Sequence, residues 1–511
     1  MNLRLSHFVA ALSLFTAGVR PVFAEVRFPN LISDHAVLQR GGPIHLWGWS
    51  SPDAHLTAHF HMQVVRTQAD ALGKWSLYLA PEAAGGPYSL TVSGDGPDRT
   101  INDLLVGDVW LASGQSNMEM PLNGFPPTAV VKDAAKEIAA ATNPRLRLLL
   151  VEHKASDYPL NDITTSWTDC TPQTAATFSA AAYFFAREIA AKENVPVGII
   201  DSTWGGTPAD SWVSLDTLGT HPELLPAIAS RARFANSQAD LDLIVAAEKR
   251  EDEAAKAAGK PLPQHPWHPV ETSWLPAALY NGMIAQFTPM SIKGFLWYQG
   301  ETNSAADRAP FYDTLFAALI ADWRSHFQQG NLPFLYVQIS SFYSPGENWG
   351  LIREQQRRTL SVANTAMAVS LDAGQADNVH PADKQVVGAR LALAARNMVY
   401  GESVTGTGPL FRQATTEILP DGTPAMRVWF DHAEGLNSHG QPAGDFELAG
   451  EDHHFVPADA RIDGQTVVVS SANLRHPAFL RYAWNSVVTH FLYNAAGLPA
   501  PTFSSESNPV R

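Results

Sequence analysis

The stretch DLLVGDVWLASGQSNM, residues 103–118, joins an apolar run to a serine that stands among glycine and amide side chains. Residues 103–113 are rich in aliphatic, β-branched and aromatic side chains, which predicts a buried strand. Ser116 then falls in the turn that leaves this strand, where backbone N–H groups are free and a side chain can stand exposed. Such a position suits a nucleophile. It equally suits an ordinary helix N-cap, so Ser116 alone does not decide between the two.

The first 24 residues are expected to form a secretory signal peptide. Arg4 precedes the short apolar stretch 8–19, and Val22-Phe23-Ala24 fits a small-residue cleavage site. The apolar stretch is too short to span a membrane, and no later stretch approaches about 18 uninterrupted apolar residues. We therefore expect an exported chain, periplasmic or secreted, that begins at Glu25 and has no membrane partner.

Composition excludes several classes of protein. Cys170 is the only cysteine of the 511 residues, so no intramolecular disulfide can form, and we interpret this residue as part of the core. The formal net charge of −15 becomes −17 once Arg4 and Arg20 leave with a signal peptide that holds no Asp or Glu. The chain has no basic stripe interleaved with aromatic residues, which argues against nucleic acid as a partner.

The rhythm of the sequence predicts three parts. Residues 25–105 contain short strand-like runs separated by turn residues, which is typical of a small β-sandwich. From 106 to about 400, strand-like and helical runs alternate, which predicts a parallel sheet with helices on both faces. Residues 401–511 return to strand-like runs, and 214–275 form a charged, helix-prone and then proline-rich insertion.

Two histidines of this insertion, His265 and His268, invite a metal interpretation. They lie in a proline-rich loop where we expect no acid or cysteine ligand nearby, so we predict no metal site there. No other motif calls for a cofactor.

Polar residues gather where the strands of the α/β part are expected to end. These ends carry 114–118, 202–207, 297–303 and 372–374, the last followed by 377–381. In open α/β sheets, ligands bind outside the carboxyl ends of the strands. A serine, a glycine pair, an asparagine and an Asp-x-x-His motif therefore all arrive at one edge, and these are the parts that acyl transfer needs.

Each part has a chemical reason. A serine hydroxyl needs a base such as histidine, and the histidine needs an acid that fixes its tautomer. The oxyanion needs donors that are already oriented, which the Ser116 amide, a glycine amide from 205–206 and the Asn303 side chain can supply. An acid three residues before a histidine also occurs at Glu451/His454, but only Asp377/His380 follows a strand of the α/β part. No Gly-x-Ser-x-Gly motif is present, which weighs against an α/β-hydrolase.

The sequence resembles the sialate O-acetylesterase family of bacterial carbohydrate esterases, within the SGNH hydrolase superfamily. The resemblance extends over nearly the whole chain after the signal peptide and is carried by DVWLASGQSNMEMPL, VPVGIIDSTWGGTPADSW, GFLWYQGETN and DNVHPADKQVVGARLA. It implies that Ser116 is the nucleophile, His380 the base and Asp377 its acid partner. It also implies that Gly206 and Asn303 form the oxyanion hole together with the Ser116 amide.

The same resemblance implies a flavodoxin-like α/β core flanked by β-sandwich or jelly-roll-like regions from both chain ends. Gln115, Gln299 and Glu301 match family positions, and we place them, with Trp204, either against the substrate or behind the residues that touch it.

The function expected is a secreted esterase that removes O-acetyl groups from sugars. An alternative is a sugar-binding protein without catalysis, whose stacking platform would be formed by Trp204, Trp212, Trp274, Trp297 and Trp349. A peptidase has no motif in its support.

Neutral plant-type glycans such as xylan or xyloglucan fragments are favoured over 9-O-acetyl sialic acid. A site for the sialic carboxylate would be expected to offer Arg or Lys, and the strand-end motifs have none among their central residues. Arg308 and Arg353 are the cations that could still reach the site, so a sialic acid-specific 9-O-acetylesterase is kept as the alternative.

Overall fold

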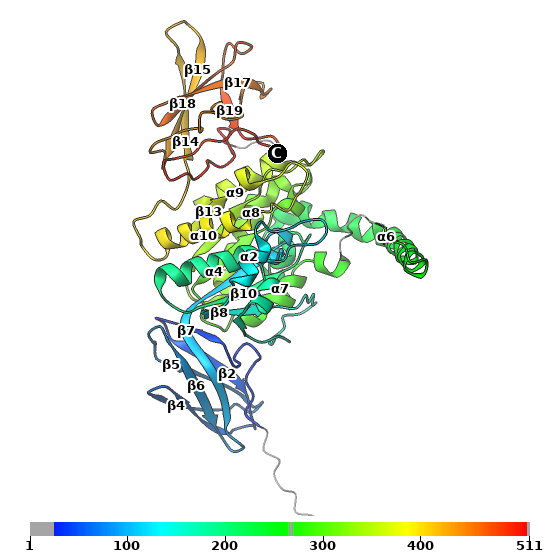
Figure 1. Ribbon diagram of the computed structural model, residues 1–511, viewed down its shortest axis with the longest axis vertical. Helices are drawn as coiled ribbons and strands as arrows, with labels where there is room; N and C mark the ends of the chain where they lie inside the picture. The colour runs from blue at the N-terminus through cyan, green and yellow to red at the C-terminus, as the bar shows by residue number, and fades with distance from the viewer. Residues whose placement is uncertain (1–24, 264, 266–267, 269, 508–511) are drawn as a thin grey trace, which may run out of the picture.

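The computed structural model describes residues 25–507 except 264, 266, 267 and 269, so the predicted signal peptide lies outside the described residues. An α/β core lies in the middle of the elongated molecule, with a β domain at each end (Figure 1). Within the described part of the chain, no helix combines the length and the apolar character that crossing a membrane requires.

The N-terminal β domain has two sheets. Strands β2 and β5 pair antiparallel, and the other sheet joins β4, β3, β6 and β7, with β1 parallel to β7. Burial alternates along β5, so one face of the strand packs inward. The strands are β1 (Val37–Gln39), β2 (Ile44–Trp49), β3 (His55–Phe60), β4 (Gln63–Gln68), β5 (Lys74–Leu79), β6 (Gly85–Ser93) and β7 (Arg99–Gly114).

Strand β7 passes from this domain into the core. Its first half, from Arg99 to Val106, pairs antiparallel with β6, and its second half, from Asp108 to Gly114, pairs parallel with β10. The buried strand predicted at 103–113 lies entirely within it, which confirms that prediction. The domain boundary expected between residues 105 and 106 therefore falls inside one continuous strand.

The central sheet has the order β13-β12-β11-β7-β10-β8-β9. All neighbours are parallel except β9, which pairs antiparallel with β8 at the edge. The run β10-β7-β11-β12-β13 has the flavodoxin-like order 2-1-3-4-5, and β8 is an added strand outside it. The strands are β8 (Asn143–Leu150), β9 (Thr168–Cys170), β10 (Val197–Thr203), β11 (Gly294–Tyr298), β12 (Phe334–Gln338) and β13 (Thr365–Val369).

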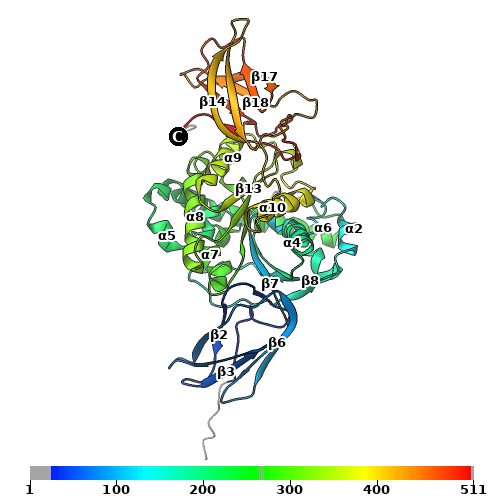
Figure 2. The same cartoon turned by 90° about the vertical axis from the view of Figure 1, so that its left-hand side faces the viewer.

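Helices cover both faces of this sheet. Figure 2 shows α4 and α10 on one side of it and α7 and α8 on the other. The α-helices are α1 (Ser116–Glu119), α2 (Ala134–Ala139), α3 (Pro172–Ala176), α4 (Ala180–Glu193), α5 (Leu215–Gly219), α6 (Leu225–Ala257), α7 (Ala278–Met283), α8 (Tyr312–Phe327), α9 (Trp349–Arg358) and α10 (Lys384–Met398). The chain fills the sheet first on one side of β7 and then on the other, so the order reverses at β7.

The expected insertion at 214–275 is mainly helical, and α6 extends away from the core (Figure 1). The expectation that no acid lies near its two histidines was wrong, because both histidines lie against acids of α6, the helix that precedes them. His265 Nε2 lies 3.2 Å from Asp252, and His268 Nε2 lies 3.0 Å from Glu248.

The C-terminal β region is one antiparallel sheet of order β14-β15-β18-β17-β16-β19-β20. The Phe411 ring of β14 stacks on Phe503 of β20 at 4.7 Å, so the first and last strands approach and the sheet is nearly a closed barrel, not a jelly roll. The strands are β14 (Leu410–Ile418), β15 (Pro424–Asp431), β16 (Phe446–Ala449), β17 (Val456–Asp463), β18 (Thr466–Ser470), β19 (Phe479–Tyr482) and β20 (Phe503–Ser504).

Candidate active site

Ser116 begins helix α1 at the carboxyl end of β7, where the strand order reverses. Gly114, just before it, has φ +136°, and a Cβ there would lie 2.2 Å from the Tyr298 carbonyl oxygen of β11. Only glycine therefore allows the two strand ends to approach this closely. The backbone N–H of Gln115 donates a 3.0 Å hydrogen bond to the same carbonyl oxygen. The half-buried Ser116 is thus held at the switch point where α/β sheets bind ligands.

The glycine pair that follows β10 lies against Ser116. A Cβ on Gly205 would lie 3.2 Å from the Ser116 Cβ and 2.8 Å from Glu119 Oε2, so a side chain at this position would force one of these groups to move. Gly206 has φ +69°, and its carbonyl accepts a 2.8 Å hydrogen bond from the Trp274 indole N–H. The backbone of Gly205 therefore lies close to the serine, and Gly206 follows it directly; both glycines are half-buried.

Asn303 comes from the turn after β11 and is buried with its amide in a fixed orientation. Its Oδ1 accepts hydrogen bonds from the Ala209 backbone N–H at 2.9 Å and from Gln299 Nε2 at 2.7 Å. Both bonds use the oxygen, which assigns the remaining end of the amide to the NH₂ group. Nδ2 is thus the donor that a ligand's oxygen could use.

Two of the predicted residues support this turn from inside the protein. Gln299 is buried, donates from Nε2 to Thr207 O as well as to Asn303, and accepts from the Tyr312 hydroxyl at 2.9 Å. Gln115 is also buried, and its Oε1 accepts from the backbone N–H groups of Gly300 and Thr302. Their bonds go to protein groups, which favours a role in positioning Asn303 over contact with a substrate.

His380 lies on the loop between β13 and α10 and packs its ring against the edge of Phe125, with centroids 5.3 Å apart. Among the described atoms, its Nε2 is buried and has no hydrogen-bond partner. Burial, followed by the nearby Lys384 ammonium, lowers the pKa of His380 to about 4. The ring is therefore neutral at pH 7 and able to accept a proton.

Asp377 is not brought against this ring. The carboxylate is exposed, and no ion pair between Asp377 and His380 occurs in the part of the chain that the structure describes. The nearer contact is from Asn378, whose Oδ1 accepts a 2.9 Å hydrogen bond from the His380 backbone N–H. The second Asp-x-x-His-like pair, Glu451 and His454, is exposed on the segment between β16 and β17 of the C-terminal sheet.

A buried polar network lies beneath the serine and was missed from the sequence. Asn117 Nδ2 donates to Glu301 Oε1 at 2.6 Å and to the Val379 carbonyl at 3.0 Å, and its Oδ1 accepts from Lys384 Nζ. Burial raises the pKa of Glu301 and lowers that of Lys384 to about 7. Lys384 is the first residue of α10, four residues after the loop residue His380, and no local pattern of the sequence marks it as buried.

A cavity of about 590 Å³ opens beside this constellation, and we call it the proximal cavity. Its lining includes Glu119 of the serine helix, Phe125 against His380, and His153. His153 stacks on the half-buried Trp204 with centroids 4.4 Å apart and lies 3.0 Å from Glu119. Of the four predicted substrate residues, Trp204 is the one that is not fully buried, and it adjoins the proximal cavity because His153, which stacks on it, lines that cavity.

The tryptophan platform considered above is not present. Trp212, Trp297 and Trp349 are buried, so they cannot stack on a sugar. Trp274 is half-buried and lies under the Arg308 guanidinium, whose Cζ is 5.0 Å from the ring centroid. Arg353 is buried and donates to the Ala483 carbonyl, which removes it as a candidate ligand for a carboxylate.

Two other reactive-looking groups are structural. The Cys170 thiol is buried, donates to the Ala141 carbonyl and has its pKa raised by burial to about 11, as expected for a core residue. His35, Asp103 and Asp169 place ligand atoms within 4.8 Å of one another. Arg147 reaches both carboxylates, at 3.0 and 3.1 Å, and so neutralises the charge that a cation would need.

Comparison with known proteins places the chain among esterases. A family model described as carbohydrate esterase, sialic acid-specific acetylesterase, matches residues 257–397. The chain is 28% identical to mouse sialate O-acetylesterase, with 94% of each chain covered, and 29% identical to the human enzyme, with 93% and 92% covered. The structure of a carbohydrate acetylesterase from Xanthomonas citri superposes with a TM-score of 0.80 at 35% identity, covering 94% of this chain and all of that one.

Proposed function

Because this chain belongs to the sialate O-acetylesterase family of carbohydrate esterases, we propose that it hydrolyses acetyl esters of sugars with Ser116 as nucleophile and His380 as general base. The protein is a carboxylic ester hydrolase that acts on acetylated carbohydrates.

One observation carries the assignment of residues. Asn117 follows Ser116 directly and donates a hydrogen bond to the carbonyl of Val379, which precedes His380. The helix of the nucleophile and the loop of the base are therefore joined by one buried side chain. A network of this kind holds reacting groups in a fixed relation, which is the main requirement of general-base catalysis.

In this mechanism, the neutral His380 ring takes the Ser116 Oγ proton as Oγ attacks the acetyl carbonyl carbon. The resulting oxyanion accepts hydrogen bonds from the amides of Ser116 and Gly206 and from Asn303 Nδ2. His380 then protonates the sugar oxygen as its bond to the acetyl carbon breaks, which leaves acetyl-Ser116. A water molecule, deprotonated by the same ring, attacks the acetyl carbon, and His380 returns the proton to Ser116 Oγ as acetate is released.

Asp377 has a smaller share in this proposal than in the triad that the resemblance implies. Its exposed carboxylate lies three residues before His380 and would stabilise the imidazolium through a field that water screens. We therefore assign orientation of His380 mainly to its packing on Phe125 and to the bonds of Asn378 and Asn117 around its loop.

The substrate favoured is a neutral acetylated glycan such as a xylan or xyloglucan oligosaccharide. Glu119 and Glu152 line the proximal cavity, and its lining includes no lysine or arginine. Such a lining disfavours an anionic sugar and offers acceptors for sugar hydroxyl groups.

A sialic acid 9-O-acetyl ester is the second candidate, and one observation favours it. Arg308 covers the ring of Trp274, whose indole N–H is bound to the Gly206 carbonyl, so one guanidinium lies within two contacts of the proposed oxyanion hole. A guanidinium is the group that pairs best with a carboxylate.

The test of the catalytic assignment is acetate release from acetylated xylo-oligosaccharides by Ser116→Ala. Loss of the nucleophile is expected to lower kcat by about 10³-fold or more. The matched control is Ser113→Ala near the end of β7, because the buried Ser113 Oγ has no hydrogen-bond partner among the described atoms and its removal leaves nothing unpaired. A Ser116→Ala protein that keeps more than about a tenth of the wild-type rate, with the control unchanged, would refute the assignment.

A further inference from the structure

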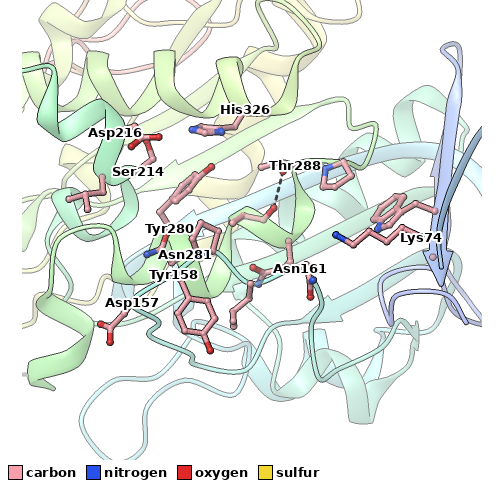
Figure 3. Close-up of a pocket in the computed structure, with 18 of the residues that line it drawn as sticks. Lys74, Asp157, Tyr158, Asn161, Ser214, Asp216, Tyr280, Asn281, Thr288 and His326 are labelled. Atoms are coloured by element: carbon pink, nitrogen blue, oxygen red, sulfur yellow. Dashed lines mark hydrogen bonds between the residues drawn. The ribbon is translucent and has the colours of Figure 1, made fainter. Parts of the chain in front are cut away.

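A second cavity, of about 630 Å³, lies between the N-terminal β domain and the core, and we call it the interdomain cavity. Figure 3 shows Lys74 on the side of the N-terminal domain, Asp216 and His326 on the opposite side, and Asn161 between them. The domains meet beside it, where a ring nitrogen of His45 lies 2.8 Å from the Pro289 carbonyl oxygen. The cavity is therefore bounded by packed elements of both domains.

Its lining combines aromatic rings with neutral and acidic hydrogen-bonding groups. Trp47 and Trp49 alternate along β2 and lie on its half-buried outward face. Tyr158 is 68% exposed on the opposite wall. Flat apolar faces next to acceptors are the features that bind pyranose rings and their hydroxyl groups.

The charges of this lining select against anions. Asp157 and Asp216 line it with exposed carboxylates, and Lys74 is the one lysine among its lining residues. The His326 ring, also in the lining, lies 3.2 Å from the Asp322 carboxylate. Among the residues that line the cavity, negative charge therefore exceeds positive charge, and one cation, Arg27, lies beside the lining, over the Trp49 ring. A neutral polyol gains hydrogen bonds to these carboxylates, whereas a carboxylated sugar is repelled.

One segment of chain lines both cavities. Residues 151–167 connect β8 to β9 without helix or strand, and their first part, with His153, lines the proximal cavity. The next part, residues 157–161, lines the interdomain cavity. Four residues span at most about 14 Å when fully extended. His153 in the proximal cavity and Asp157 in the interdomain cavity are therefore close enough for one oligosaccharide to contact both.

This segment is held in place by the core. The backbone N–H groups of Ser156 and Leu160 donate to the carbonyls of Ala278 and Asn281 at 3.0 and 2.9 Å. Gly282 has no room for a Cβ, because that atom would lie 1.8 Å from the Lys154 carbonyl oxygen. A connection fixed at several points forms a preformed wall, which lowers the entropy cost of binding.

We propose that the interdomain cavity is a binding site for the remote sugar residues of a neutral oligosaccharide whose acetylated residue occupies the active site. The proposal rests on the proposed function as a carbohydrate esterase. It predicts that affinity depends on chain length through Tyr158 and Asn161, while the chemistry at Ser116 does not depend on them.

The experiment compares Tyr158→Ala and Asn161→Ala with wild type and with a control variant, Trp429→Ala. Trp429 is an aromatic residue of the C-terminal sheet and is 41% exposed. Melting temperatures confirm that each variant folds. The rate on p-nitrophenyl acetate, which has no sugar, is expected to stay unchanged. KM for acetylated xylo-oligosaccharides or xyloglucan fragments of six or more sugars is expected to rise about tenfold in Tyr158→Ala, and KM for acetylated xylobiose to stay constant.

Binding is measured separately from activity. Unacetylated xylohexaose and a xyloglucan heptasaccharide are titrated into each protein, and binding is followed by saturation-transfer NMR. We expect binding to wild type and to Trp429→Ala, and no binding signal with Tyr158→Ala. Equal KM values for long and short chains in every variant, or no binding of either probe to wild type, would overturn the proposal. Binding that depends on Tyr158 in a protein that deacetylates no carbohydrate would instead refute the proposed function and leave this site standing.

Discussion

Asn117 donates a 3.0 Å hydrogen bond from Nδ2 to the carbonyl oxygen of Val379, although 262 residues separate them in the sequence. The same side chain accepts from Lys384 and donates to Glu301, so one amide satisfies a buried cation, a buried acid and the loop of His380. An amide can serve all three because it has both donors and an acceptor. Neither a serine nor an aspartate in its place could do so.

Asn117→Ala is therefore expected to lower kcat by about 100-fold, as a displacement of about 1 Å between reacting groups can, while KM changes little. The reason is that the His380 loop loses its bond to the serine helix. The measurement is kcat and KM on p-nitrophenyl acetate, with circular dichroism as a check of folding. Asn397→Ala is the control, because Asn397 Nδ2 donates to the Val404 carbonyl outside the proposed site. An unchanged kcat in a folded Asn117→Ala protein would contradict the positioning role.

Asn303→Asp tests the oxyanion hole with little change of shape. The aspartate keeps an acceptor for the Ala209 N–H and for Gln299, but it cannot donate as Nδ2 does. We expect kcat to fall by about 10²-fold or more with KM nearly constant, the pattern of a donor used only in the transition state. An increase in KM alone would show that Asn303 positions the substrate instead.

The pH profile tests His380 as the base. Burial and then Lys384 lower the pKa of His380 to about 4, so the ring remains neutral, and the enzyme active, below the usual value of 6.5. The acidic limb of kcat/KM is expected near pH 4. The contribution of His380 to stability has the same sign: between pH 6.5 and 4 its ring binds more protons in the unfolded chain than in the folded one, so this contribution to the free energy of unfolding falls as the pH is lowered through that window.

Lys384→Met removes the nearby positive charge and is expected to move this acidic limb to higher pH. Lys132→Met is the matched control, since Lys132 is exposed and paired with Asp383 at 2.8 Å, where water screens its charge. A wild-type limb near pH 6.5, or one that stays in place without Lys384, would argue that another group titrates.

The strand ends could be predicted from the sequence because each one combines a buried run with a sharp change to polar residues. Residues 103–113 and the turn at Ser116 are examples, and the sheet then brings Ser116, the glycine pair and Asn303 to one edge. Local pattern suffices for such features, since the carboxyl ends of parallel strands always share an edge.

Other features depended on contacts that no local pattern records. The lysine at 384 reads as an ordinary helix residue, and only packing reveals that it is buried against Asn117 and Tyr298. The acids near His265 and His268 come from α6, more than ten residues away in sequence. The closure of the C-terminal sheet rests on Phe411 meeting Phe503, and its strand-like runs alone predict a sandwich equally well.

Gly205→Ala tests the contact between the glycine pair and the nucleophile. The added methyl would lie 3.2 Å from the Ser116 Cβ and 2.8 Å from Glu119 Oε2, so one of these groups must move. We expect kcat to fall at least tenfold through displacement of Ser116. Gly219→Ala is the control, because no atom lies within 4 Å of its Cβ position, and its activity should equal that of wild type. Equal activities of the two variants would show that the loop tolerates a side chain.

Arg308 decides between the two substrate classes. Its guanidinium lies over Trp274, and its side chain is mostly buried, with Asp307 at 3.8 Å as a weak ion-pair partner. If neutral glycans are the substrates, Arg308→Gln should leave kcat/KM on acetylated xylo-oligosaccharides within about threefold of wild type, because a neutral substrate has no carboxylate that pairs with Arg308. If a sialic carboxylate is bound there, the same change should lower kcat/KM on 9-O-acetyl sialic acid at least tenfold, as loss of a charge-assisted pair does. The measurement is kcat/KM of both proteins on both substrates. We expect wild type to favour the neutral ester; a tenfold wild-type advantage for the sialic ester that disappears in Arg308→Gln would reverse the assignment of substrate and leave the Ser116 mechanism unchanged.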